Sequence, residues 1–327
     1  MQNKRIQPYT GKGIFRNGHT NSILAGSPAR KLVARRHSKD FRRQTRQIII
    51  HAGDNIRLSA SYNTQENKSS PVVILLHGWL GCSDSLYLIT LGDFLYKQGY
   101  HVVRLNLRDH GESHNLNEKI FHSCRIQEVI NACIYIQNEF NHPVSLIGFS
   151  LGANFALRIN AFTTREQLKI DNTIAFCPVI DPESTLNCLE NSLLVYRNYF
   201  MRRWKVSFYK KAEAFPELYS KQIFDQCKTL RQATEVLATR YAGFSSLHSY
   251  LNGYSIAGNR LSTLQSNTHI VLAKDDPIIN WQDQDKLASS PYKNILITEH
   301  GGHCGFLEPD LSSQWINKYS QFRLQQI

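Results

Sequence analysis

The sequence predicts an α/β protein with a mainly parallel central sheet, helices on both faces of the sheet and a helical insertion. Continuous apolar runs that suit buried strands alternate with amphipathic helical patterns, and short connections join them. This alternation stops at about residue 181 and resumes at about residue 268. A serine flanked by glycines at one strand–helix junction predicts that the sheet carries a reactive site.

The first part of the expected core begins with two antiparallel strands, at 46–52 and 56–62, because a Gly-Asp-Asn turn separates two β-rich segments. The run PVVILLHG at 71–78 is apolar throughout, as expected for a central parallel strand covered on both faces. The elements expected after it are a helix at 85–99, a strand at 100–107, a helix at 126–140, a strand at 143–149, a helix at 151–162 and a strand at 172–179.

Helical patterns rich in aromatic and charged residues fill the interruption, the longest of them at 193–215, and they predict a cap. The elements expected after the cap are a strand at 268–273, a short helix near 281–288, a strand at 294–299 and a helix near 312–325. We therefore expect a basic, loop-rich N-terminal arm over 1–46, an α/β core over 47–180 and 268–327, and a helical cap insertion over 181–267.

Composition limits the class of protein. The 327 residues are 42% hydrophobic and 20% charged, which suits one large packed domain and argues against wholesale disorder. Seven cysteines, an odd number without any C-x-x-C pair, predict reduced thiols in a cytoplasmic protein and neither a disulfide framework nor a zinc site. The N-terminal residues lack the apolar segment of a signal peptide, and no run approaches the roughly 18 to 20 residues of a membrane span.

The net charge of +12 is concentrated at one end of the chain. Residues 1–50 contain twelve Lys or Arg and a single acid, Asp40. Three interpretations of this arm stay open: a solvated or salt-bridged wrap against the domain, a segment attracted to an anionic membrane surface, or a nucleic-acid contact. The last is disfavoured because no recognition motif accompanies the charge.

The stretch LIGFSLGANF places Ser150 between an expected strand and an expected helix, with Gly148 and Gly152 on either side. A sharp strand-to-helix turn lifts a serine hydroxyl clear of the sheet, and it needs small residues two positions before and after. The serine also lies at a helix N-terminus, where free N–H groups favour a developing negative charge. This pattern predicts Ser150 as a nucleophile.

A serine nucleophile needs a base, and the base needs an acid that orients it. We expect His303 as the base because Gly301-Gly302 precede it in a loop after the last strand, and we interpret His300 as a structural histidine. We expect Asp276 as the acid. The neighbouring Asp275 is interpreted as a solvated loop acid, and Asp181 remains a rival for the acid's role.

The segment HGWLG at 77–81 follows the first parallel strand and predicts an oxyanion hole, formed by the backbone N–H groups of Trp79 and Leu151. His77 is interpreted as a structural hydrogen-bonding residue. Asp109 and His110, within RDHGES, are interpreted in the same way and not as metal ligands. No metal or other cofactor is required by this chemistry.

These motifs resemble the α/β-hydrolase superfamily, and more narrowly its YheT-like branch of carboxylesterases and lipases. The resemblance covers nearly the whole chain and is carried by FRNGH (15–19), HGWLGCSDSLY (77–87), GFSLGANF (148–155), YAGFSSLHSY (241–250), AKDDPII (273–279) and GGHCGFLE (301–308). It implies the α/β-hydrolase fold, Ser150 as nucleophile, Asp276 as acid and His303 as base. It also implies ester hydrolysis, of acylglycerols, phospholipids or short- to medium-chain acyl esters.

Two alternatives to ester hydrolysis stay open: acyl transfer or thioester cleavage with the same three residues, and a catalytically silent fold used for binding. Some relatives carry an H-x-x-x-x-D motif credited with acyl transfer, which this sequence lacks. The cap aromatics Tyr196, Phe200 and Trp204 are expected to contact the substrate, with Tyr199, Phe208 and Tyr209 as further candidates for an acyl channel; packing of the cap onto the core is the alternative. Basic residues alternate with them and suit a surface near anionic lipid.

Overall fold

The computed structural model describes residues 6–326, and an eight-stranded sheet forms its centre. The strands lie in the order β1-β2-β4-β3-β5-β6-β7-β8. β1 and β2 are antiparallel to their neighbours, and β3 to β8 are parallel to one another. The strands are β1 (Arg46–His51), β2 (Arg57–Asn63), β3 (Val72–Leu76), β4 (His101–Leu105), β5 (Val144–Phe149), β6 (Ile170–Phe176), β7 (Asn267–Ala273) and β8 (Lys293–Thr298). The expected mainly parallel sheet is confirmed.

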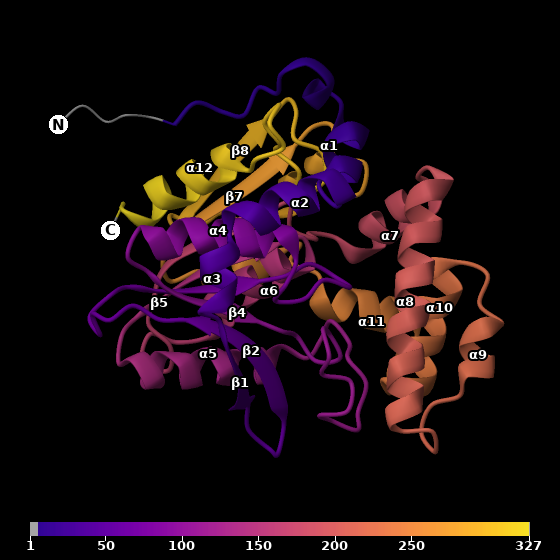
Figure 1. Cartoon of the computed structure of the whole chain (residues 1–327). Helices are drawn as coiled ribbons and strands as arrows, with labels where there is room; N and C mark the ends of the chain where they lie inside the picture. Colours follow the sequence, from indigo (N-terminus) through magenta and orange to yellow (C-terminus); the bar gives the residue numbers. More distant parts are fainter. Residues whose placement is uncertain (1–5, 327) are drawn as a thin grey trace.

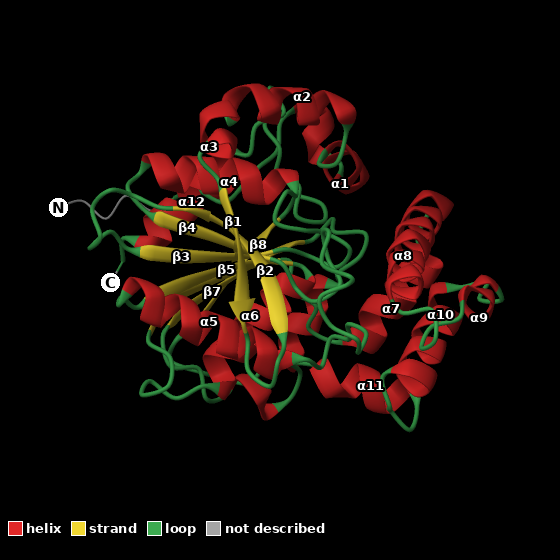
Figure 2. Cartoon of the chain, turned by 60° about the horizontal axis from the view of Figure 1, so that its bottom comes forward, coloured by secondary structure: helices red, strands yellow, loops and turns green. Residues whose placement is uncertain are grey.

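Helices cover both faces of this sheet (Figure 2). Val73 and Leu75 of β3 pack into the apolar cluster that includes α4, whereas Ile74 and Leu76 pack into a second cluster that includes α5. Because successive side chains of a strand point to opposite faces, a strand that is apolar throughout is buried on both sides. The covering helices are α4 (Leu86–Lys97), α5 (Ile126–Phe140), α6 (Leu151–Phe162) and α12 (Gln314–Leu324). The short helix expected near 281–288 is a 3-10 turn, Trp281–Lys286.

The N-terminal arm is more ordered than the loop-rich segment that the sequence predicts. A 3-10 turn (Gly13–Arg16) leads into α1 (Gly18–Leu24), α2 (Pro28–His37) and α3 (Lys39–Arg43). The N-cap side chains of Asn17 and Ser27 accept hydrogen bonds from the first turns of α1 and α2, and Pro28 occupies the first position of α2. The sequence does not predict these helices because their apolar periodicity is weak. The N-cap residues Asn17 and Ser27 are the sequence signals that could have located them.

Helices also form the segment between β6 and β7, where the sequence predicts a cap. They are α7 (Pro182–Asn191), α8 (Leu194–Ala214), α9 (Lys221–Asp225), α10 (Leu230–Val236) and α11 (Leu247–Tyr254), with a π-helical turn at Leu237–Tyr241. Figure 1 shows α8, α9 and α10 beside the sheet and its covering helices. Within the described residues, no helix combines the length and apolarity that crossing a membrane requires.

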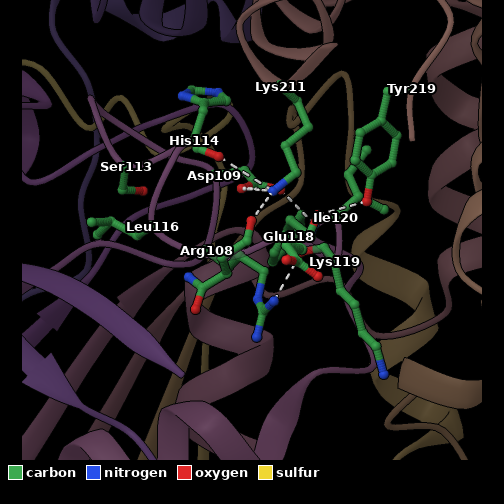
Figure 3. Close-up of polar contacts among 12 residues, drawn as sticks. Arg108, Asp109, Ser113, His114, Leu116, Glu118, Lys119, Ile120, Lys211 and Tyr219 are labelled. Atoms are coloured by element: carbon green, nitrogen blue, oxygen red, sulfur yellow. Dashed lines mark hydrogen bonds and ion pairs between the residues drawn. The ribbon is translucent and has the colours of Figure 1, made fainter. Parts of the chain in front are cut away.

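A buried ion pair connects α8 to the loop after β4 (Figure 3). The ammonium of Lys211 lies 3.0 Å from Oδ1 of Asp109, and both side chains are at most 5% exposed. The same ammonium donates hydrogen bonds to the backbone carbonyls of His114 and Asn117. Nearby, the hydroxyl of Tyr219 donates to the carbonyl of Glu118 at 2.8 Å. Asp109 is therefore a structural residue, as the sequence analysis interpreted it.

Lys211→Met tests how strongly this pair holds the cap. Methionine keeps the apolar stem of the side chain but lacks the ammonium, which leaves a buried carboxylate and two carbonyls without this donor. We therefore expect a loss of about 3–5 kcal/mol in the free energy of unfolding. Urea denaturation measures it. Lys210→Met is the matched control, because Lys210 pairs with Glu112 in solvent and its loss is expected to cost at most about 1 kcal/mol. Equal effects of the two substitutions would contradict this account.

Candidate active site

Ser150 occupies the strained turn between β5 and α6. Its φ is +53° and its ψ is −116°, a conformation that costs a non-glycine residue roughly 1–3 kcal/mol. A Cβ on Gly148 would lie 2.3 Å from the carbonyl oxygen of Gly152, and a Cβ on Gly152 would lie 2.4 Å from the carbonyl oxygens of Leu76 and His77. Only glycine fits at both positions, which confirms the steric reason for the motif.

Ser150, His303 and Asp276 lie in hydrogen-bonding contact, although the three residues come from different loops. Nε2 of His303 lies 3.0 Å from Oγ of Ser150, and Nδ1 lies 2.9 Å from Oδ2 of Asp276. A carboxylate only accepts, so Nδ1 carries a proton, and in the neutral ring Nε2 accepts from the serine hydroxyl. Oδ1 of Asp276 accepts from the backbone N–H groups of Ile278 and Ile279, which orients the carboxylate.

Two opposing effects set the pKa of His303. Burial lowers it, because the charged imidazolium loses its hydration. The Asp276 carboxylate, whose side chain is only 1% exposed, raises it through charge and through the hydrogen bond. The carboxylate outweighs burial, and the pKa of His303 is raised to about 9. The pair is therefore built to stabilise a positive charge on the imidazole.

The rival residues lie elsewhere. Asp181 caps α7, where its Oδ1 accepts from Glu183 and Ser184, and its Oδ2 pairs with Lys286. Asp275 is not the solvated loop acid that the sequence analysis predicted. It is half-buried, and its Oδ1 accepts from the backbone N–H of Gly302 at 2.8 Å, within the loop that carries His303.

The segment expected to form the oxyanion hole runs directly past the serine. A Cβ on Gly78 would lie 3.2 Å from Cβ of Ser150, and the N–H of Gly78 donates to the hydroxyl of Tyr87 at 2.9 Å. Trp79 and Leu151 both line the cavity beside Ser150. Among residues 6–326, the structure gives neither of their N–H groups an acceptor. Both donors are therefore free to bind a ligand oxygen.

Two buried histidines hold this segment in place. Nε2 of His110 accepts from the N–H of Leu80, and Nε2 of His77 accepts from the N–H of Leu107. Burial lowers the pKa of His77 to about 4 and that of His110 well below its usual value, so both rings are neutral. Their structural interpretation fits these bonds. From the cap, the guanidinium of Arg203 donates to the carbonyl of Leu80 at 2.6 Å.

A cavity of about 760 Å³ opens beside Ser150 and His303, which both line it. The cap aromatics Tyr196, Phe200 and Trp204 line it too, as do Tyr199 and Phe208, but Tyr209 does not line it and hydrogen-bonds Asp225. The Phe200 ring stacks on Trp79 at 5.5 Å between centroids, and the Trp204 ring meets Trp79 edge-on at 4.9 Å. These aromatics therefore pack the cap onto the core and form the cavity wall at the same time.

One group of potential metal ligands occurs among the described residues. Donor atoms of Cys177, His303 and Cys304 lie within 4.8 Å of one another. Both ring nitrogens of His303 already contact Asp276 and Ser150, so a metal ion that bound the ring would displace one of these contacts.

The N-terminal arm contributes to the site, which the sequence analysis did not predict. Oγ of Ser22 accepts from the N–H of His303 at 2.8 Å, and Oδ1 of Asn21 accepts from the N–H of Leu307 at 3.0 Å. A Cβ on Gly18 would lie 1.8 Å from the carbonyl oxygen of Asp275, so α1 packs directly on the loop that precedes the acid. The motif FRNGH at 15–19, which includes the first residues of α1, is the sequence signal that could have indicated this contribution.

The chain is similar to known proteins in sequence and in fold. Residues 73–313 match the model of a family described as "Alpha/beta hydrolase family". The chain is 26% identical to "Putative esterase YheT" of Escherichia coli K12, over 82% of this chain and 81% of that protein. It is 21% identical to a monoacylglycerol lipase of Saccharomyces cerevisiae, over 76% of this chain and 57% of the yeast protein. The esterase Pf2001 of Pyrococcus furiosus has a similar fold, with a TM-score of 0.57 at 17% identity over 87% of this chain and 93% of that one.

Titration of His303 followed by NMR tests the electrostatics of the site without any substrate. In the native chain we expect the imidazole to titrate near pH 9, far above an ordinary histidine. In Asp276→Asn the carboxylate is gone and burial acts almost alone, so the midpoint is expected to fall to about 6.5 or below. A midpoint that is the same in both proteins would show that Asp276 does not control this ring.

Proposed function

The chain belongs to the alpha/beta hydrolase family, and from this premise we propose that it is a serine hydrolase that cleaves carboxylic esters with Ser150, His303 and Asp276. The observation that carries the proposal is the continuous contact of these three side chains, at 3.0 and 2.9 Å, in the wall of a cavity. Esterase and lipase names among the relatives support the reaction class.

In the proposed reaction the neutral form of His303 is the active one, and its share of the molecules rises as the pH approaches the raised pKa of about 9. Oγ of Ser150 attacks the acyl carbonyl carbon while Nε2 of this neutral ring takes the hydroxyl proton. The N–H groups of Trp79 and Leu151 hold the oxyanion that forms, and removal of one such donor typically slows a reaction about 10²–10³-fold. His303 then protonates the departing alcohol. Water attacks the acyl-enzyme in the same way, which releases the acid and restores the serine.

The cavity supports an ester with an apolar acyl group. Aromatic and aliphatic side chains of the cap line it, among them the proposed substrate contacts Tyr196, Phe200 and Trp204. Its volume of about 760 Å³ lies within the range of cavities that bury most of a ligand of drug size. Acylglycerols, phospholipids and medium-chain esters are the substrates we propose, and a cytoplasmic location with peripheral contact to anionic membranes completes the proposal.

Ser150→Ala tests the nucleophile. We expect the wild type to hydrolyse p-nitrophenyl butyrate and to be labelled by a fluorophosphonate probe, and the variant to do neither, because among residues 6–326 Ser150 is the one whose hydroxyl contacts a ring nitrogen of His303. Ser262→Ala, at an exposed serine outside the cavity, is the control and should retain both properties. Full activity of Ser150→Ala would sink the mechanism, and a wild type that hydrolyses no ester and does not react with the probe would favour a binding role.

Ser22→Ala tests whether α1 positions the base. Loss of the hydroxyl that binds the His303 N–H should let the loop shift, and small misplacements of catalytic groups cost up to about 10²-fold, so we expect kcat to fall about 10- to 100-fold with little change in KM. Ser22→Thr keeps the hydroxyl and should restore kcat, and Thr20→Ala in the same helix should leave it unchanged. A change in melting temperature without a change in kcat would assign Ser22 a purely structural role.

A further inference from the structure

The cations of the N-terminal arm lack carboxylate partners. Ten Lys and Arg residues lie between residues 6 and 50, and none of them forms an ion pair with any described residue. The salt-bridged form of the wrap is therefore wrong for the described residues. Arg30 is buried and donates to the carbonyl of Ala25 and to Oγ of Ser313, but the other nine cations are exposed and carry a surplus of positive charge into solvent. Such a surplus attracts anionic partners over about a Debye length.

The long cap helix divides into two halves with different surroundings. Toward its C-terminal end, Lys205, Lys210 and Lys211 pair with Asp225, Glu112 and Asp109. Toward its N-terminal end, Arg197 and Arg202 form no ion pair within residues 6–326. The apolar side chains at this end are exposed, namely Leu193 (53%), Leu194 (65%), Val195 (51%) and Tyr199 (52%). The first half of α8 thus combines free cations with uncovered apolar groups.

Both of these surfaces border the same cavity. Lys31 and Arg35, exposed and one helical turn apart on α2, line it together with the exposed Ile23 of α1. Val195 and Tyr199 line it from the cap. The two sides also touch, because Nδ1 of His19 lies 3.1 Å from the hydroxyl of Tyr196. We call this surface the rim and define it as Ile23, Lys31, Leu32, Arg35, Leu194, Val195 and Tyr199; Leu32, on α2, is 70% exposed.

We propose that the rim docks on an anionic lipid bilayer and that the cavity opens toward that bilayer. Lys and Arg beside exposed apolar side chains is the pattern of surfaces that lie in the headgroup region of a membrane. One exposed acid, Asp84, also lines the cavity, but its carboxylate lies 3.4 Å from the guanidinium of Arg104. The proposal rests on the proposed function for its purpose, since a lipid ester would pass from the bilayer to Ser150 without crossing water.

Vesicle co-sedimentation tests the docking independently of catalysis, because it uses Ser150→Ala in the full chain. We expect this protein to sediment with vesicles of phosphatidylcholine and phosphatidylglycerol, to bind much less to phosphatidylcholine alone, and to be released by high salt. Adding Lys31→Glu and Arg35→Glu is expected to lower the partition coefficient at least about 30-fold. Equal binding to both vesicle types, or binding that salt does not change, would overturn the proposal.

The matched charge control is Lys68→Glu with Lys169→Glu. Both lysines are exposed and form no ion pair with the described residues; Lys68 lies in the loop that leads into β3 and Lys169 directly precedes β6, at the edge of the sheet opposite Ser150. This variant has the same net charge as the rim variant and should keep most of the binding. A loss as large as that of the rim variant would show that net charge alone, and not this surface, drives the contact.

Two further substitutions test the apolar half of the rim. Leu32→Gln with Leu194→Gln should lower binding about tenfold, whereas Ile49→Gln, at an exposed isoleucine on β1, should not. If substitution of the two rim leucines does not change vesicle binding, the surface is not inserted and the proposal fails.

Retention on duplex DNA at physiological salt without vesicle binding would assign the arm to nucleic acid. Failed docking with intact fluorophosphonate labelling of the wild type would leave the proposed hydrolase standing.

Discussion

The conformation of one residue constrains the whole site. Ser150 has a positive φ at the point where β5 meets α6, and the close approaches that this turn demands leave space only for hydrogen at Gly148 and Gly152. The sheet must be parallel at this point, because the next strands along it then end at the same edge and supply the loops of Asp276 and His303. The hydroxyl, the imidazole and the carboxylate meet because strand order brings three distant segments together.

The sequence predicted those parts of the fold that depend on local pattern. The strands from β3 to β8 each contain an apolar run that ends in a turn, and each catalytic candidate lies in or near the loop that follows one of these strands. Two features depend instead on tertiary contacts that no local pattern records. The arm forms helices because Tyr9, Phe15 and Phe41 are buried against the core, and Asp275 binds a backbone N–H that approaches it only after the last loop folds.

The oxyanion segment is held from two sides. Within the core, neutral His77 and His110 bind its flanking backbone without adding charge beside the serine. From the cap, Arg203 binds the carbonyl of Leu80, while Lys211 binds Asp109, the residue before His110. The position and electrostatics of the segment therefore depend on the cap as well as on the sheet. The cap forms part of the cavity wall and also holds the oxyanion segment in place.

The hydrogen bond from the His303 N–H to Ser22 joins residues that are 281 positions apart. A ribosome emits the beginning of a chain long before its end, and domains organise as they emerge. Ser150 is synthesised about halfway along the chain, yet the imidazole and its support from α1 meet only when almost the entire polypeptide has been made. Nascent chains, and chains truncated before His303, therefore carry a serine without its base. The contact between Ser150 and His303 forms only at the end of synthesis.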